Sequence, residues 1–212
     1  MEKRRMGPQH FLNPKPVALV GTIVDEKPNF LTVSWIASAS ADPPAIAVAI
    51  RNVRYSLRGI RQHLTFSVNL PSVDLAGVAN YCGSVSGAEI DKMKACNLSI
   101  FAGSLKGAPL IEQCPINMEC AVMQFVEIGD HTLVIGSIRE TYVAEDCLVN
   151  EALDIEKLRP LCFCTTSSGL GDYYGLGEIV ASIAGGGGDL RHAPSVRPNE
   201  RSDNDDSPRE TG

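Results

Sequence analysis

The sequence predicts a mainly β protein, an antiparallel barrel or sandwich with a few short helices. Strand-like segments outnumber helix-like ones, and they come in pairs joined by short turns. The clearest pair is formed by residues 116–128 and 131–143, because the Gly129-Asp130 step between them is a strong hairpin signal. Such pairing favours an antiparallel architecture, whereas a parallel sheet needs a long, usually helical, crossover after each strand.

The remaining elements follow from apolar periodicity and from turn residues. The first hairpin is expected from strands at 16–24 and 30–36, with 25–29 as its polar turn and 38–44 as the next loop. Further strands are expected at 45–50, 65–71, 98–101, 116–128, 131–143 and 161–165. Helices are expected at 53–63, 73–81, 87–96 (with Ile90 and Met93 facing inward) and 151–159.

One domain is expected over residues 1–188, followed by a polar tail over 189–212. The Gly-rich segment "GGGGD" marks the break, and residues 191–212 contain Val196 as the only aliphatic residue besides Ala193. A segment with so little apolar surface cannot compensate the entropy lost on folding, so disorder is expected. No internal repeat is visible.

Composition excludes several classes of function. A net charge of −6 and a pI of about 5.2 argue against nucleic acid as a partner. The apolar run "AIAVAI" falls far short of the ~20 residues of a membrane helix, and the charged N-terminal segment has no secretory pattern. The seven cysteines include no C-x-x-C and no spacing suited to zinc, so no metal site is expected. We therefore expect a cytoplasmic protein with mostly buried thiols, and a redox role for Cys162 and Cys164 stays open.

Several sequence features that can mark a functional site do not indicate one in this chain. The segment "GLGDYYGLG" at 169–177 is similar to a dinucleotide fingerprint, but only "EIVASIA" follows it, so it is interpreted as a Gly-rich loop carrying Tyr173 and Tyr174. The segment "GSVSG" at 83–87 lacks the P-loop pattern, and no G-x-S-x-G elbow is present. The four histidines are scattered without metal-ligand spacing.

The candidate site is "NFLTVSW" at 29–35, which ends on the single tryptophan, Trp35, and is followed by Ser38, Ser40 and "RNVRYS" at 51–56. Hydroxyls, backbone amides and arginines can hold a phosphate, and an indole offers a flat apolar surface to a ring. Alternatively, Trp35 caps the core and the serines line a solvent loop. The residues alone leave both readings open.

Seven segments, taken together in their order and spacing, resemble the flavin reductase-like family, and within it the flavoredoxin branch, from about residue 13 to 184. They are "NPKPVALVGT", "NFLTVSW", "DPPAIAVAI", "YSLRGI", "TFSVNLP", "YCGSVSGAEIDKMKA" and "LVIGSI". The resemblance implies an FMN-binding split barrel, a six-stranded antiparallel Greek-key barrel with flanking helices. It also implies a homodimer with noncovalent FMN near the subunit interface.

Site residues follow from the resemblance by position. It implies flavin contacts from Asn29, Thr32, Ser34, Trp35 and His131, and phosphate contacts from Ser56 and Lys92. Asn29 would pair with the pyrimidine edge of the ring, and either Phe163 or Cys164 would supply a further contact. Asn29 and Trp35 lie roughly 20 Å apart on an extended strand. Either Asn29 belongs to the turn and folds back, or the two act on different ends of the cofactor, or they serve two copies of a dimer.

The expected function is that of an FMN-binding redox protein of the flavin reductase-like, flavoredoxin type, an oxidoreductase that transfers electrons through noncovalent FMN, for example as a carrier between proteins. Two alternatives stay open: an NAD(P)H-dependent flavin or ferric reductase, and a non-catalytic flavin-binding module. The resemblance assigns no catalytic residue, because no protein acid or base is required for the flavin to accept a hydride. His131 is the candidate for tuning the ring or closing the site.

Overall fold

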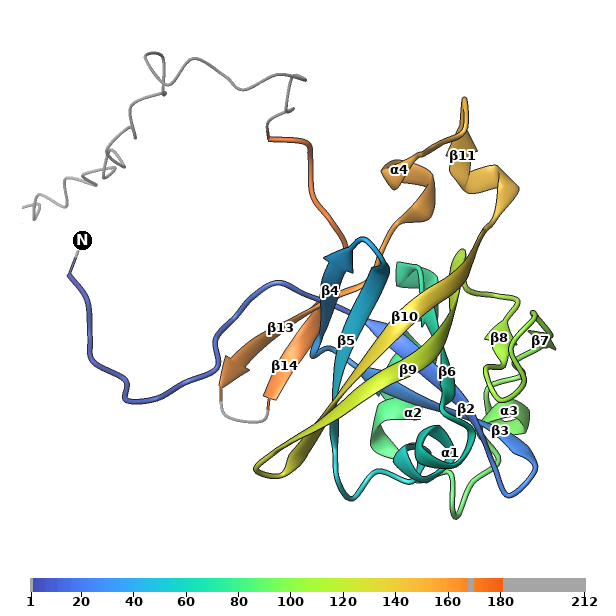
Figure 1. Cartoon of the computed structure of the whole chain (residues 1–212). Helices are drawn as coiled ribbons and strands as arrows, with labels where there is room; N and C mark the ends of the chain where they lie inside the picture. Colours follow the sequence, from blue (N-terminus) through green and yellow to red (C-terminus); the bar gives the residue numbers. More distant parts are fainter. Residues whose placement is uncertain (1, 168–169, 181–212) are drawn as a thin grey trace, which may run out of the picture. The chain divides into compact units, whose positions relative to one another are not determined.

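The computed structural model describes residues 2–167 and 170–180. Its main feature is a seven-stranded antiparallel sheet with the strand order β3-β2-β6-β9-β10-β5-β4 (Figure 1). The strands are β2 (Ala18–Val24), β3 (Lys27–Val33), β4 (Ile36–Ala41), β5 (Pro44–Arg51), β6 (Thr65–Leu70), β9 (Ile116–Ile128) and β10 (His131–Val143). Within the described residues the edge strands β3 and β4 do not pair, so the sheet is not closed. The predicted mainly β, antiparallel fold is confirmed, with seven strands in place of six.

Smaller elements surround this sheet. The short strands are β1 (Lys15–Pro16), β13 (Cys162–Ser167) and β14 (Leu170–Tyr174), which form one sheet, and the pairs β7 (Ile100–Phe101) with β8 (Leu110–Ile111) and β11 (Leu148–Val149) with β12 (Ala152–Leu153). The helices are α1 (Ser56–His63), η1 (Val73–Leu75), α2 (Ala76–Ser84), α3 (Lys92–Ala95), η2 (Glu145–Cys147) and α4 (Ile155–Leu158). Among the described residues, no helix has the length and apolar character needed to span a membrane.

The core lies against the main sheet, where α1 packs on β2 and α2 packs on β3 (Figure 1). Alternate side chains of the strands, such as Val20, Phe66 and Val134, are fully buried there. Helix α1 approaches the sheet closely at Gly59, since a Cβ at this position would lie 2.2 Å from the Ile23 carbonyl oxygen. This close approach fixes the start of α1, at Ser56, next to β3.

The first hairpin turns more tightly than predicted. Its turn consists only of Asp25 and Glu26, whose φ angles of 48° and 61° match the mirror-image turns that two-residue hairpins favour. Residues 27–29 therefore belong to β3, and Asn29 pairs with Thr22 across the hairpin. The prediction of a turn over 25–29 was wrong because Pro28, taken as a turn residue, is tolerated on an edge strand.

Two predicted loops are strands. Residues 36–41 form β4, which pairs with β5, and residues 170–174 form β14, which pairs with β13. The small residues of β4 gave little β signal, and the glycines around β14 favoured a loop in spite of Tyr173 and Tyr174. In both segments the hydrogen-bonding partner strand decides the structure. The predicted helix 87–96 shortens to α3, and Ile90 is 37% exposed, whereas Met93 packs on the core as predicted.

The long central hairpin was predicted correctly, since β9 and β10 span residues 116–128 and 131–143. All seven cysteines are free thiols, four buried and three partly buried. The compact unit of the chain ends at Gly177. The predicted boundary between residues 188 and 189 and the predicted disorder of 191–212 lie outside the described residues.

Candidate functional site

A groove runs along β3 and is lined by the seven residues that the family resemblance assigned to the flavin ring and its phosphate. It consists of two adjoining cavities that share Leu31, Arg51 and Arg54, with volumes of about 130 Å³ and 210 Å³. We call them the outer end and the inner end of the β3 groove. The outer end is lined by Thr32, Ser34, Trp35 and His131, and the inner end by Asn29, Ser56 and Lys92.

The inner end is built from buried polar groups that hold one another. Asn29 Nδ2 on β3 donates a hydrogen bond to Ser56 Oγ at the start of α1 over 2.6 Å, and both residues are buried. Lys92 is only 4% exposed, and its Nζ donates to the carbonyl oxygens of Phe30 at 2.8 Å and Cys82 at 2.7 Å. Since an ammonium group carries three N–H donors, one remains for a ligand. Burial lowers the pKa of Lys92 from its ordinary value.

Two arginines add positive charge along the groove. Arg51 ends β5, and Arg54 follows in the turn before α1, where its Nη1 donates to the Gly83 carbonyl oxygen at 3.0 Å. None of the described residues lining either end is a carboxylate, although the whole chain carries a net charge of −6. The groove therefore favours an anionic ligand.

The segment 83–87, which lacks the P-loop pattern, forms one wall of the inner end. Val85, Ser86 and Gly87 line this cavity. A Cβ on Gly87 would lie 1.9 Å from Asn29 Oδ1, so only glycine permits the two segments to meet. The backbone of this segment consequently lies close to any ligand held by Ser56 and Arg54.

The outer end is aromatic. The rings of Trp35 and His131 are stacked with centroids 4.8 Å apart and planes at 15°, and His10 meets Trp35 edge-on at 5.4 Å. Trp35 lies between β3 and β4 and is 41% exposed. A second cavity of about 350 Å³, with mainly apolar walls, also borders Trp35 and includes Leu12 and Leu133.

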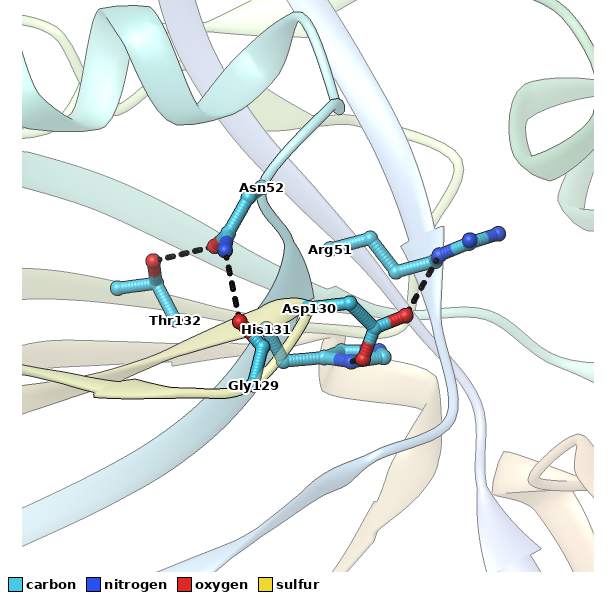
Figure 2. Close-up of polar contacts among 6 residues, drawn as sticks. All are labelled: Arg51, Asn52, Gly129, Asp130, His131 and Thr132. Atoms are coloured by element: carbon cyan, nitrogen blue, oxygen red, sulfur yellow. Dashed lines mark hydrogen bonds and ion pairs between the residues drawn. The ribbon is translucent and has the colours of Figure 1, made fainter.

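The neighbouring Asp130 fixes the orientation of the His131 ring. Its Nδ1 lies 2.7 Å from Asp130 Oδ1, and the same carboxylate faces Arg51 Nε at 3.5 Å (Figure 2). The hydrogen bond with His131 lowers the pKa of Asp130, so this side chain stays ionised. Asn52 fixes the turn that carries these residues, because it accepts a hydrogen bond from Thr132 Oγ1 and donates one to the Gly129 carbonyl oxygen (Figure 2).

The outer end also carries two hydroxyls, those of Thr32 and Ser34. Thr32 Oγ1 donates to the Ala79 carbonyl oxygen at 2.5 Å, which ties β3 to α2. Thr32 and Ser34 also border a side cavity of about 360 Å³ whose wall includes Phe163 and Tyr173. Of the two candidates on β13, Phe163 lines this cavity and Cys164 does not.

The structure brings all seven predicted residues together, and it excludes one of the three explanations for the distance between Asn29 and Trp35. Asn29 lies within β3, so the explanation that it belongs to the turn was wrong. The two side chains lie at opposite ends of the groove. Ser38 and Ser40 are on the exposed strand β4 and line neither end.

Arg51 and Arg54 are the site residues that sequence reasoning did not single out, although it named the segment 51–56. Two arginines three residues apart, between a strand and a helix, were the available signal. The complete groove suits a ligand with an aromatic ring system at one end and an anionic group at the other.

Comparison with known proteins identifies the family and the fold. A model of the flavin reductase like domain matches residues 11–167. The fold is similar to a flavoredoxin from Methanosarcina acetivorans (TM-score 0.80, 31% identity, 86% of this chain and 95% of that chain). It is also similar to the flavoredoxin of Desulfovibrio vulgaris (TM-score 0.79, 32% identity, 85% of this chain and 97% of that chain).

A relative known from its sequence is an uncharacterized protein of Archaeoglobus fulgidus, 36% identical over 113 residues. The match covers 53% of this chain and 64% of that protein, so the chain spans somewhat less than two thirds of its length. The domain match extends over well more than half of the chain. The chain belongs to the flavin reductase-like family.

Proposed function

We propose that this chain is a redox protein of the flavoredoxin type, which holds FMN noncovalently in the β3 groove and passes electrons between redox partners. One observation carries the proposal: the groove joins an exposed aromatic end to a cationic end, with no carboxylate among its described lining residues. The similarity to two flavoredoxins supports it.

The inner end suits the phosphate of FMN. Arg51 and Arg54 supply fixed positive charge, Lys92 retains one N–H donor, and Ser56 offers a hydroxyl. Charge-assisted hydrogen bonds of this kind are the stronger ones in proteins. Because Asn29 Nδ2 already donates to Ser56, we assign Asn29 to this end of the cofactor in place of the pyrimidine edge expected from the sequence.

The outer end suits the ring system. The stacked pair of Trp35 and His131 offers a partly exposed aromatic surface, and the hydroxyls of Thr32 and Ser34 line the same end, where they would meet the ribityl chain. Bound FMN supplies the hydride and one-electron chemistry. The chain positions the ring, limits its contact with water, and holds the His131 imidazole against Asp130 at a fixed orientation.

A homodimer remains part of the proposal. Five residues of the edge strand β4, 37–41, are exposed and small, and the exposed Trp35 borders the apolar cavity beside β4. Light scattering of the FMN-bound protein should give the mass of two chains, and a monomer with full FMN content would contradict this. The expected compartment is the cytoplasm, with which seven free thiols are compatible.

The function is tested by reconstitution and reduction. The purified protein should bind about one FMN per chain, released on denaturation; FAD as the bound chromophore, or no binding after loading with FMN, would contradict the proposal.

Anaerobic addition of NADH or NADPH then separates the alternatives. For a carrier, we expect that the flavin absorbance stays unchanged with the nicotinamides and is lost when a reduced protein partner is added. Rapid bleaching would identify an NAD(P)H-dependent flavin or ferric reductase, which the family description favours. No reduction by either would leave a non-catalytic flavin-binding module.

A further inference from the structure

The charge lining the groove changes sign just beyond its inner end. A cavity of about 350 Å³ adjoins the inner end and shares Asn29, Tyr55 and Gly87 with it. Three carboxylates line this cavity: Asp25, Glu89 and Asp91. We call them the acidic mouth. Lys27 is the one cationic side chain among the described residues that line the same cavity.

We propose that the acidic mouth makes the site select FMN over FAD. This inference rests on the proposed function, with the phosphate of FMN held at the inner end. FMN ends at that phosphate, whereas FAD continues into a second phosphate and an adenosine. An extension leaving the inner end past Asn29 and Tyr55 enters the cavity lined by the acidic mouth, where its phosphate meets like charges. A repulsive element of this kind is a common basis of specificity.

Two of the three carboxylates of the mouth are held by local contacts. Asp25 accepts a hydrogen bond from the Tyr55 hydroxyl at 2.7 Å and lies 3.7 Å from Arg58 Nη2, which partly offsets its charge. Asp91 caps α3 by accepting a hydrogen bond from the Lys94 amide at 3.1 Å. All three carboxylates are exposed, so their effect on a ligand is screened by salt and is modest for each residue.

The test removes the charge and keeps the shape. The mouth variant carries Asp25→Asn, Glu89→Gln and Asp91→Asn. Asparagine accepts the positive φ of position 25, and it caps a helix about as well as aspartate, so the fold is preserved. The matched control carries Glu112→Gln, Glu145→Gln and Glu151→Gln, which change the net charge equally at exposed positions that line neither the groove nor the mouth.

Dissociation constants for FMN and FAD are then measured with the apo-forms of all three proteins, at low and at high salt. The unmodified protein should bind FMN more tightly than FAD. Since one exposed charge interaction changes affinity by roughly 1.5- to 5-fold, the mouth variant should bind FAD about tenfold more tightly at low salt. Its FMN affinity should change by less than about threefold, and the control should keep the original ratio. Added salt should lower the ratio of the FAD dissociation constant to the FMN dissociation constant, and this change should be larger in the unmodified protein than in the mouth variant.

The outcomes separate this inference from the proposed function. Equal affinities for FMN and FAD in the unmodified protein, or the same ratio in the mouth variant, would overturn the inference and leave FMN binding intact. If the mouth variant bound both flavins more tightly by the same factor, the inference would also be overturned, because the cause would then be a general change in the electrostatic potential of the site. A protein that binds neither flavin would contradict the proposed function itself.

Discussion

The two ends of the β3 groove differ in how deeply their side chains are buried and in what holds them. At the inner end, Lys92 is 4% exposed, and the buried side chains of Lys92, Asn29 and Ser56 are held by hydrogen bonds to other parts of the fold. At the outer end, Trp35 is 41% exposed and lies in the link between two strands, in contact with other rings. The buried polar side chains of the inner end are thus part of the folded core, whereas the aromatic side chain of the outer end lies at the surface.

This difference separates stability from binding. A group that satisfies buried carbonyl oxygens cannot be removed without a cost to folding, because the carbonyls are left unpaired. An exposed ring can be removed with little cost to folding, although a ligand that stacks on it loses affinity. Substitutions at the inner end should therefore change stability and binding together, and those at the outer end binding alone.

The largest effect is expected for Lys92→Ala. It leaves the carbonyl oxygens of Phe30 and Cys82 without their buried donor, so the free energy of unfolding of the apo-protein should fall by about 2–4 kcal/mol. Denaturant melts of the apo-protein measure this, with Lys94→Ala as the control on the same helix, because Lys94 is exposed and should cost less than ~0.5 kcal/mol.

The same variant also tests the phosphate assignment. Affinity for FMN should weaken by about 10- to 150-fold, the value of a charge-assisted bond, and affinity for riboflavin, which lacks the phosphate, should weaken much less. Parallel loss of both ligands would show that Lys92 acts on the site only through the fold.

At the outer end, Trp35→Ala should weaken FMN and riboflavin alike, by about 5- to 150-fold, because it removes a stacking surface that both ligands share. Stability of the apo-protein should change by less than ~1 kcal/mol, since the indole is exposed. Fluorescence titration and melting of Trp35→Phe, which retains a ring, provide the control. A loss of several kcal/mol in stability would show that the outer end belongs to the core after all.

A smaller effect is expected for Ser56→Ala at the inner end. The change removes the acceptor of the Asn29 amide and one candidate hydroxyl for the phosphate, so stability should fall by about 1 kcal/mol. FMN affinity should fall about fivefold, and riboflavin affinity should fall less. Ser34→Ala, at the outer end, is the matched hydroxyl deletion, and it should leave stability nearly unchanged. If Ser34→Ala were the more destabilising of the two, the contrast between the ends would be wrong.

The smallest effect concerns alkaline pH. Burial lowers the pKa of Lys92 from its ordinary value of 10.5, so in the folded protein this group loses its proton before a free lysine does. Between the folded and the unfolded pKa the unfolded state binds more protons, and the Lys92 contribution to the free energy of unfolding therefore rises with pH in that window.

In the same window the FMN affinity should fall, because the positive charge of Lys92 leaves the inner end. Riboflavin affinity, measured over the same pH range, is the reference for changes in the ring itself. A constant ratio of the two dissociation constants would show that the Lys92 charge does not act on the phosphate.

The sequence by itself determined the parts of the fold that depend on local pattern. The alternation of apolar and polar residues, together with the Gly129-Asp130 turn, was enough to predict β9 and β10. The spacing of Leu57 and Ile60 was enough to predict the buried face of α1. The order of seven segments pointed to the family and, through it, to seven groove residues, because a family pattern records spatial neighbours that are distant along the chain.

Only the tertiary structure decided which partners those residues have. Strand β4 has little β signal of its own and exists through its hydrogen bonds to β5. Lys92 looks like a solvated surface lysine in the sequence, and its burial follows from the packing of α3 on β3. The groove is cationic because Arg51 and Arg54 line the same cavity as the segment 83–87, which lies about thirty residues further along the chain. Such contacts depend on long-range packing, which no local pattern records.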